Sequence, residues 1–565
     1  MSSRALRKAQ KEREEQDRLA GQEIEDADGP DESRGARRPQ KSLFSMLDEA
    51  ESEHNQSDDD EEEQELKEGG VPQTQEASGA ENQGPTSTAK RKKKKKKATK
   101  KKKALVEEGT QAAQMDEIDA ALQALSTKSN AAKPDTATVS TVDPEVEELC
   151  RLLSVDTSHL HAANEMRRLF GRTAVEDEGE GRRNRGQQQG GLAAAIGSRG
   201  SSLAELARKR NIFIQGRENW PSAPSGGLGM EVVEKRSDGS VEYAFVHNGS
   251  YRDSQRQFEA CVASMDPERM VQHLHFNPYH ISTLLQVSEI AKHQGDHAIA
   301  GELLERALFS FGRAVHSTFS NNLSHGKARL SFLRAENREF WLAVWRFIGN
   351  LSMRSLFRTS YEWLMLLLGL DPFNDPYRIC LIMDQYAIRS KQVEHFLELY
   401  KAMDKPWLWG KLPNIQLSRG LAINHAKTLN DGKQQLYKSA ARWPWITARL
   451  FQELEIDQIP PSIWGSMPRT EREILEMEMY VKRAKNIWNT PEAKELLIEV
   501  VSAIPTGLKA NEPDDSPITV DEARHILLTE DPELIKHIPK ETTSKVSSAS
   551  DPLPPEEDAL LQDQD

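Results

Sequence analysis

Aromatic residues are scarce outside one region of this sequence. Of its 16 Phe, 10 Trp and 9 Tyr residues, only Phe44 and Phe170 precede residue 211, and none follows Trp488. Apolar residues make up 37% of the chain, below the usual fraction for a compact domain. The flanks lack the apolar surface whose burial would offset the entropy cost of ordering them. We therefore expect the core within residues 211–488.

Cysteine and long apolar runs are also scarce. Cys150, Cys261 and Cys380 are more than 100 residues apart, which supports neither a disulfide framework nor a zinc site and fits a reducing compartment. The longest apolar run, Trp363–Leu370, has eight residues, whereas a membrane span needs roughly 18. The first 18 residues are charged throughout and lack the apolar region of a signal peptide. We expect a soluble intracellular protein with no membrane partner.

Recognisable catalytic patterns are absent from the sequence. It contains no HExxH, GxSxG, Walker or protein-kinase signature. Cys380 lies beside Ile379 and Ile382 on an apolar face, which predicts a buried thiol rather than a nucleophile. Closely spaced histidines are interpreted as satisfied or exposed rather than zinc ligands: His273, His275, His280, His293 and His297. We expect a protein that is not an enzyme and holds no metal or cofactor.

Two oppositely charged blocks lie in the N-terminal region. Residues 48–68 contain twelve acids and one base, Lys67. Residues 90–103 contain twelve bases and no acid: Lys90, Arg91, Lys92, Lys93, Lys94, Lys95, Lys96, Lys97, Lys100, Lys101, Lys102 and Lys103. The basic block suits a phosphate backbone, because each neutralised phosphate releases a counterion. It has no aromatic residue to stack on bases, so we expect binding without sequence preference. A nuclear import signal and a solvated linker without a partner are the alternatives.

Two short apolar islands interrupt this region. Leu43, Phe44 and Leu47 share one helical face within residues 41–49. The second island has apolar residues at i, i+3, i+7 and i+10: Met115, Ile118, Leu122 and Leu125. Each is too short to form a stable helix alone in water. Folding on a partner's groove and transient helicity without function both remain open.

Residues 141–204 predict two leading helices and a loop. Asp143-Pro144 starts the first helix with Asp as its N-cap. Its apolar face consists of Val146, Leu149, Cys150 and Leu153. A second helix, capped by Asp156 or Thr157, is expected to run to Phe170 and end at Gly171. Further on, the glycines of residues 226–230 lack the phosphate-loop pattern and predict a tight turn beside Trp220.

Residues 261–488 repeat a pattern of paired helices. One apolar face follows i, i+3, i+4, i+7, i+8 and i+11: Ala300, Leu303, Leu304, Ala307, Leu308 and Phe311. Gly295-Asp296 makes the turn before it, and a later helix is predicted to open at Asp375-Pro376. Pro376 and Pro413 are 37 residues apart, close to the tetratricopeptide period of roughly 34. Strand signals are weak throughout.

Together these patterns predict an all-α fold. We expect a tetratricopeptide-like helical-repeat array, preceded by a long disordered charged region and followed by a disordered acidic tail. The predicted ranges are 1–140 for the disordered region, 141–204 for the leading helices and flexible loop, 205–540 for the array and 541–565 for the tail. Such arrays expose a concave surface that holds peptides or proteins. Scaffolding without a ligand groove is the alternative.

Several motifs resemble those of one known family. The most specific stretch runs from Gln257-Phe-Glu-Ala through Ser264-Met-Asp-Pro to Asn277-Pro-Tyr-His-Ile-Ser-Thr-Leu-Leu-Gln286. Further matching motifs are Leu152-Leu-Ser-Val-Asp, Asn164-Glu-Met-Arg-Arg-Leu-Phe-Gly171, Asn219-Trp-Pro, Gly227-Leu-Gly-Met230, Leu303-Leu-Glu-Arg-Ala-Leu308, Glu336-Asn-Arg, Asp375-Pro, Leu412-Pro-Asn and Arg524-His-Ile-Leu-Leu528. With the order acidic block, lysine block, helical domain, residues 141–540 resemble the ribosome quality control complex subunit one family, whose animal members are called transcription factor twenty-five or nuclear localised protein one.

The resemblance implies a function in ribosome-associated quality control. It implies binding to large ribosomal subunits that carry a stalled nascent chain, with the lysine block on ribosomal RNA. The implied partners are the ubiquitin ligase listerin, ubiquitin, the tail-adding subunit and the segregase ATPase. Lysine-48-linked ubiquitination and degradation of the nascent chain would follow. We expect a cytoplasmic, ribosome-associated protein with a nuclear pool. The alternatives are a nuclear transcriptional regulator, for which the sequence shows no base-reading module, and a general protein–protein scaffold.

Overall fold

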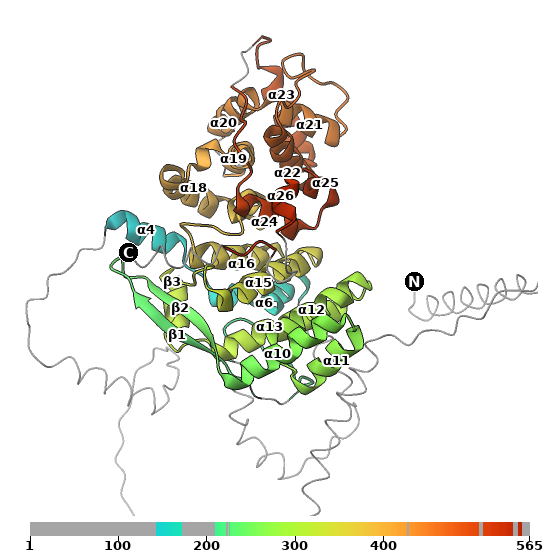
Figure 1. The fold of residues 1–565 in the computed structure, drawn as a ribbon. Coiled ribbons are helices and arrows are strands. Elements are labelled where there is room, and N and C mark those ends of the chain that lie inside the picture. Colours follow the sequence, from blue (N-terminus) through green and yellow to red (C-terminus); the bar gives the residue numbers. More distant parts are fainter. Residues whose placement is uncertain are drawn as a thin grey trace, which may run out of the picture.

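The computed structural model describes residues 143–171, 210–221, 224, 226–426, 429–507, 512–545 and 552–555. Both charged blocks and both apolar islands lie outside these ranges. The described chain is mostly helical, which confirms the predicted fold class. Figure 1 shows an elongated molecule, with α10–α13 at one end, α15 and α16 in the middle and α19–α23 at the other end.

The leading helices are three rather than two. α4 (Pro144–Leu152) begins as predicted, with the Asp143 carboxylate accepting the N–H of Glu145. The predicted second helix is divided into α5 (Thr157–Leu160) and α6 (Ala162–Phe170). His161 is extended, with ψ at 109°, and so interrupts the helical hydrogen bonds. Gly171, with φ at 83°, ends α6 as predicted.

A small sheet, which the sequence patterns did not predict, covers one side of the helices. β1 (Leu228–Lys235) and β2 (Val241–His247) form an antiparallel hairpin, and β3 (Ala328–Arg329) pairs with β2 in parallel. Gly239 supplies the positive φ, 82°, that the hairpin turn requires. Gly226 and Gly227 precede β1 with φ of 68° and 101°, which confirms a turn there. A Cβ on Gly227 would overlap the Asn248 side chain.

The first helices of the array follow the sheet. They are α10 (Gly249–Ser264), α11 (Pro267–Phe276), α12 (Ile281–His293), α13 (His297–Ala314) and α14 (Phe319–Ser324). α12 and α13 form the predicted hairpin, because Gly295 takes a φ of 84° and Asp296 caps α13 by accepting the N–H of Ile299. All six apolar residues predicted for the α13 face are buried.

The middle and later helices continue the array by packing against their neighbours in sequence. They are α15 (Ala335–Met353), α16 (Phe357–Leu370), α17 (Met383–Arg389), α18 (Val393–Trp407), α19 (Pro413–His425) and α20 (Leu429–Arg442), with short 3-10 turns η1 (Ile379–Leu381) and η2 (Trp409–Lys411). Asp375-Pro376 does not open an α-helix. Asp375 is buried with φ at 43°, and its carboxylate accepts the N–H groups of Ile379 and Cys380. The α-helix therefore begins later, at Met383.

The C-terminal helices turn back on the array. They are α21 (Pro444–Glu453), α22 (Glu471–Trp488), α23 (Pro491–Ser502), α24 (Val520–Thr529), α25 (Pro532–Ile535) and α26 (Lys540–Thr543). α22 contacts α17 and α19 as well as α21, and α24–α26 lie beside the middle of the molecule in Figure 1. In a simple stack of repeats the sides of α17 and α19 that contact α22 would be exposed, whereas here they are part of an interior shared with the C-terminal helices.

Part of the predicted tail packs on this interior. Leu553 is buried in one apolar cluster with Leu475 of α22 and Ile526 of α24. Its carbonyl oxygen accepts the Arg524 Nε hydrogen at 3.0 Å. The contact differs from the expectation of a disordered tail over residues 541–565, which rested on the acidic, aromatic-free composition. Pro552 is buried beside Leu553, so the apolar contact and the Arg524 hydrogen bond together hold this segment.

Candidate partner-binding groove

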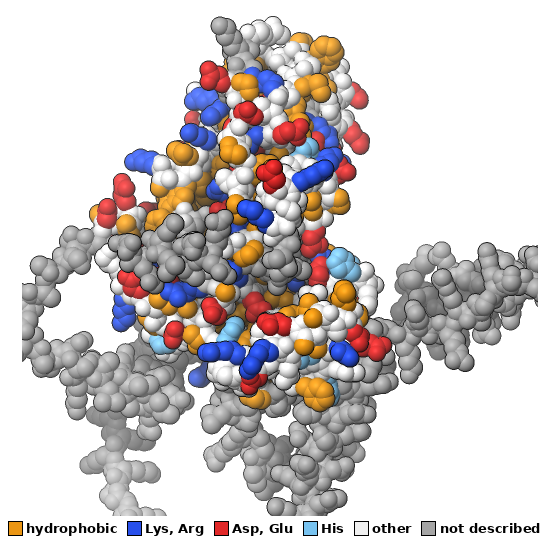
Figure 2. Space-filling model, in the orientation of Figure 1, with side chains coloured by type: hydrophobic (Ala, Val, Ile, Leu, Met, Phe, Trp, Pro, Cys, Tyr) orange, Lys and Arg blue, Asp and Glu red, His pale blue; other side chains and the backbone are white. Residues whose placement is uncertain are grey.

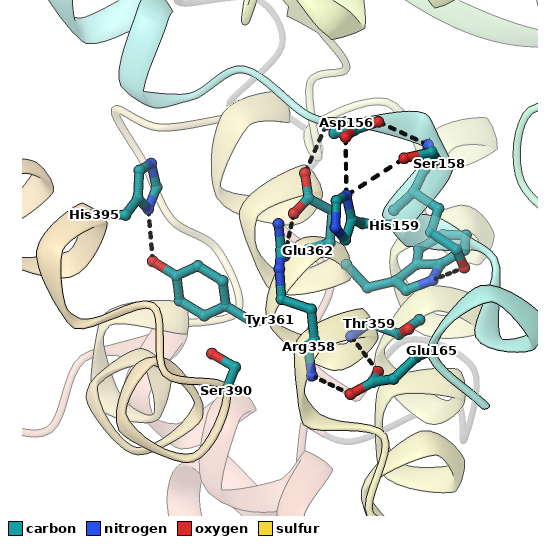
Figure 3. A network of polar contacts seen from close by, with 12 residues as sticks. Asp156, Ser158, His159, Glu165, Arg358, Thr359, Tyr361, Glu362, Ser390 and His395 are labelled. Atoms are coloured by element: carbon teal, nitrogen blue, oxygen red, sulfur yellow. Dashed lines mark hydrogen bonds and ion pairs between the residues drawn. The ribbon is translucent and has the colours of Figure 1, made fainter. Parts of the chain in front are cut away.

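The leading helices are fixed to the array by buried polar contacts (Figure 3). Glu165 of α6 accepts the N–H groups of Arg358 and Thr359 at 3.0 and 2.7 Å. These donors belong to the first turn of α16, where N–H groups have no partner within the helix. A carboxylate also interacts favourably with the helix dipole there. The N–H of Asp156 donates to Glu362 Oε1 at 2.6 Å. Residues 143–171 thus complete the array.

His395 of α18 extends the same network to α4. Its Nε2 lies 3.0 Å from the carbonyl oxygen of Leu152, which only accepts, so Nε2 carries the hydrogen. Nδ1 then accepts the Tyr361 hydroxyl hydrogen at 2.8 Å. Burial lowers the pKa of His395, in agreement with this neutral ring. The residue is a structural tie rather than an acid or base facing solvent.

A groove of about 390 Å³ lies where α15, α17 and α22 meet α24 and α25. We call it the Arg389 groove. Its apolar floor consists of Trp345, Ile348, Met479, Leu528 and Leu534. Trp345 is half-buried, and its Nε1 donates to the carbonyl oxygen of Leu528 at 3.0 Å. The ring thus holds the end of α24 against α15 and leaves one side for a ligand.

The rim of the Arg389 groove carries more positive than negative charge. Arg389, Lys482 and Arg483 line it, with Asp531 as the one carboxylate among the described lining residues. Lys482 pairs with Asp531 at 2.8 Å. The Arg389 guanidinium lies 3.5 Å from the centre of the Phe357 ring, and no carboxylate of the described residues forms an ion pair with it. Over the face that Figure 2 shows, both charge signs are interspersed.

Arg483 is held in place by a buried histidine. Its NH1 group lies 3.0 Å from His525 Nε2, while His525 Nδ1 lies 2.8 Å from the carbonyl oxygen of Tyr377. His525 therefore donates through Nδ1 and accepts from arginine through Nε2. Burial, with Arg483 next, lowers the pKa of His525 to about 3. The ring stays neutral at physiological pH. Burial also lowers the pKa of Arg483, which is only partly exposed at the groove.

The histidines that the sequence singled out do not form a metal site. Within the described ranges, no three His, Cys, Asp or Glu side chains are arranged to hold a metal ion. Both His273 Nδ1 and His280 Nδ1 lie within 2.9 Å of the Thr283 hydroxyl oxygen. His293 lies 3.3 Å from Glu289. Thr283 thus accounts for one ring nitrogen each of His273 and His280, whereas His280 Nε2 is buried without a hydrogen-bond partner among the described residues.

The three cysteines differ in exposure. Cys150 and Cys380 are buried, and Cys261 is partly exposed. Burial, with Asp375 next, raises the pKa of the Cys380 thiol well above its ordinary value. A thiolate is the nucleophilic form, so Cys380 is poorly suited to attack. This confirms the prediction of a buried thiol at that position.

The predicted nucleic-acid contacts cannot be compared with this groove, because residues 90–103 lie outside the described ranges. Sequence reasoning missed Arg389 and Arg483 as surface features. One signal was present: Leu475, Met479 and Arg483 follow i, i+4 and i+8, so a cation occupies an apolar stripe of α22. Among the helices that the structure describes, none combines the length and apolar character of a membrane span.

Comparisons with known proteins agree with the motifs. A family model described as "Transcriptional repressor TCF25" matches residues 243–555. The chain is 29% identical over 418 residues to "Ribosome quality control complex subunit 1" of Schizosaccharomyces pombe, covering 74% of this chain and 60% of the relative. It is 28% identical over 474 residues to mouse "Ribosome quality control complex subunit TCF25", covering 78% and 65%.

A further relative carries a different name. The chain is 25% identical over 450 residues to "Probable transcription factor claV" of Ampulloclitocybe clavipes, covering 69% of this chain and 55% of the relative. The matched segments thus span between about half and two thirds of these relatives. No solved structure matches the chain. Because the family model matches more than half of the sequence and includes the helices around the Arg389 groove, the chain belongs to the TCF25 family.

Proposed function

We propose that this chain is a non-enzymatic subunit of a ribosome quality control complex. The observation that carries the proposal is the similarity to relatives named as such subunits, which covers up to 78% of this chain. In this proposal the chain acts on large ribosomal subunits that hold a stalled nascent chain. It works in the cytoplasm, with a nuclear pool.

The two halves of the chain have different tasks in this proposal. The lysine block supplies electrostatic affinity for ribosomal RNA, since it has twelve bases within residues 90–103. The helical array holds protein partners: listerin, ubiquitin, the tail-adding subunit and the segregase ATPase. Holding a ligase and its substrate together raises their effective concentration without any chemical step. Lysine-48-linked chains on the nascent peptide would be promoted in this way.

Sedimentation of the full chain tests the ribosomal part. In a sucrose gradient, the chain should move into the large-subunit fractions when translation is stalled, and less so without the stall. High salt should release it more readily than mild nuclease, because the expected contact is with phosphate charge. The absence of the chain from large-subunit fractions under both conditions would contradict the proposal.

A reconstituted ubiquitination reaction tests the non-enzymatic part. The variant in which Cys150, Cys261 and Cys380 are all replaced by Ala should still support chain formation by listerin on stalled subunits. The buried, high-pKa thiol of Cys380 motivates this expectation. Linkage-specific cleavage should show lysine-48-linked chains. Loss of all chain formation by the folded triple variant would show that a cysteine takes part in transfer.

A second candidate function is nuclear regulation of transcription. It is favoured by the printed description of the family model and by the name of the Ampulloclitocybe relative. A transcriptional regulator should fractionate with chromatin and be released by nuclease digestion of DNA. A ribosome-bound subunit should remain with large subunits after the same treatment.

A further inference from the structure

The Arg389 groove has the surface of a receptor for a short amphipathic segment that carries negative charge. Its floor presents Trp345, Met479 and Leu534, and its rim presents the guanidinium groups of Arg389 and Arg483. Arg389 stacks on Phe357 and forms no ion pair with a carboxylate of the described residues. Arg483 donates to His525 and also interacts electrostatically with Asp384 and Asp531, so Arg389 is the cation of the rim that is most available to a ligand. Apolar anchors beside acidic residues would complement both features.

The chain itself contains a segment with that chemistry. Leu43, Phe44 and Leu47 share one helical face, and the acidic block over residues 48–68 follows directly. Phe44 is the one aromatic residue before Phe170. The second island, around Leu122, has an apolar face but lies outside any such acidic block. The first island is therefore the better match to a groove that is both apolar and cationic.

The length of the intervening chain permits the contact. Residues 50–142 separate the first island from α4, the first described helix. A coil of roughly 90 residues has an end-to-end distance of about 50–60 Å. That is comparable with the diameter expected for a domain of about 350 residues. The island can therefore reach any face of the array, and tethering favours the contact over binding to a second molecule.

We propose that residues 41–68 bind the Arg389 groove of the same chain. Leu43, Phe44 and Leu47 lie against the apolar floor, and the acidic block faces the guanidinium groups of the rim. The contact is reversible and competes with any partner segment that uses the groove. It does not depend on the ribosomal function proposed above.

Photo-crosslinking in the full chain tests this contact directly. Replacing Phe44 with p-benzoylphenylalanine should give, on irradiation, intramolecular crosslinks to peptides of α15, α17, α22 or α24. The matched control carries the same probe at Leu122, within the second island, and should not label these helices. Because the probe retains an aromatic ring, the variant keeps the apolar anchor. Crosslinks from residue 44 to other parts of the array, or only between two chains, would overturn the proposal.

Charge substitutions test the role of the rim. Arg389→Glu should lower the crosslink yield about twofold to fivefold, the usual range for one partly exposed charge contact. Added salt should lower the yield in the unsubstituted chain. Replacing the acids of residues 58–63 with Lys in the Arg389→Glu chain should restore part of the yield. If neither Arg389→Glu nor added salt changes the crosslink yield, the electrostatic part of the proposal is excluded.

Hydrogen exchange gives a second readout that does not rely on the probe. In the full chain, Leu43→Ser, Phe44→Ser and Leu47→Ser together should increase exchange in α17 and around residues 528–534. Serine substitutions in the second island, at Ile118, Leu122 and Leu125, provide the matched control and should leave these segments unchanged. Equal exchange in the two triple variants would overturn the proposal.

Discussion

Removing the Glu165 carboxylate should loosen the joint between the leading helices and α16. The carboxylate is buried, with 8% of the residue exposed, and accepts two N–H groups at 3.0 and 2.7 Å. In Glu165→Ala both donors lose their partner, and an N-cap interaction alone is worth about 1 kcal/mol. Hydrogen bonds to charged groups contribute about 1.5–3 kcal/mol each. Because the two bonds share one carboxylate, we expect a total loss of about 2–4 kcal/mol in the free energy of unfolding.

Urea unfolding of the full chain, followed by circular dichroism, measures this loss. With a slope of about 3 kcal/mol per molar urea for a domain of this size, the midpoint should fall by about 1 M. Glu165→Gln keeps one acceptor oxygen and should lose about half as much. Glu147→Ala, an exposed substitution on α4, is the matched control and should change stability by less than about 0.5 kcal/mol. Equal midpoints for Glu165→Ala and the control would refute the capping argument.

Three further outcomes follow from the structure and the sequence. Trp363→Ala should lower the free energy of unfolding in urea by about 3–5 kcal/mol, because the ring is fully buried and its Nε1 donates to the Leu160 carbonyl oxygen. Trp345→Ala should lower it by less, because that ring is half-buried. Equal losses for the two variants would contradict this ranking. Burial raises the pKa of Asp384 from 3.8 to about 6, so the folded state binds its proton more tightly than the unfolded state. Stability from this residue should be full below about pH 4 and fall by about 3 kcal/mol as pH rises through 6. Asp384→Asn should flatten that part of the pH profile, and an unchanged slope would refute the assignment. Replacing Lys92–Lys97 with Gln should weaken binding to large ribosomal subunits and reduce its salt dependence, whereas an unchanged salt slope would exclude the lysine block as an RNA contact.

Local patterns predicted local structure well where packing and propensity agree. The α13 face, the Asp143 cap and the Gly295 turn were readable, because each depends on residues within about one or two turns of each other. The hairpin of β1 and β2 was missed although Asp238-Gly239 is a turn signal, since neither strand alternates apolar and polar residues along its whole length. The predicted domain boundaries stay predictions.

Contacts between distant residues were not predictable from one sequence. Glu165 and Thr359 are 194 positions apart, and His395 and Leu152 are 243 apart. No spacing rule links such residues, because the pairs depend on how whole helices pack. The Arg389 groove is a similar case, since its lining comes from five helices. Only Arg483, as a cation within an apolar stripe, left a local signal.

The capping of α16 by α6 also sets an order of events during synthesis. Glu165 leaves the ribosome 193 residues before Arg358, its first partner. At about 5–20 residues per second, that interval lasts roughly 10–40 s. During this interval the apolar faces of the leading helices cannot pack on α16, because α16 has not been synthesised. The hydrogen bond between His395 and Leu152 forms later still, because His395 follows Leu152 by 243 residues. A nascent chain of this protein thus carries leading helices without their packing partner while about a third of its 565 residues are synthesised. We expect chaperones that act at the ribosome to bind it during that interval.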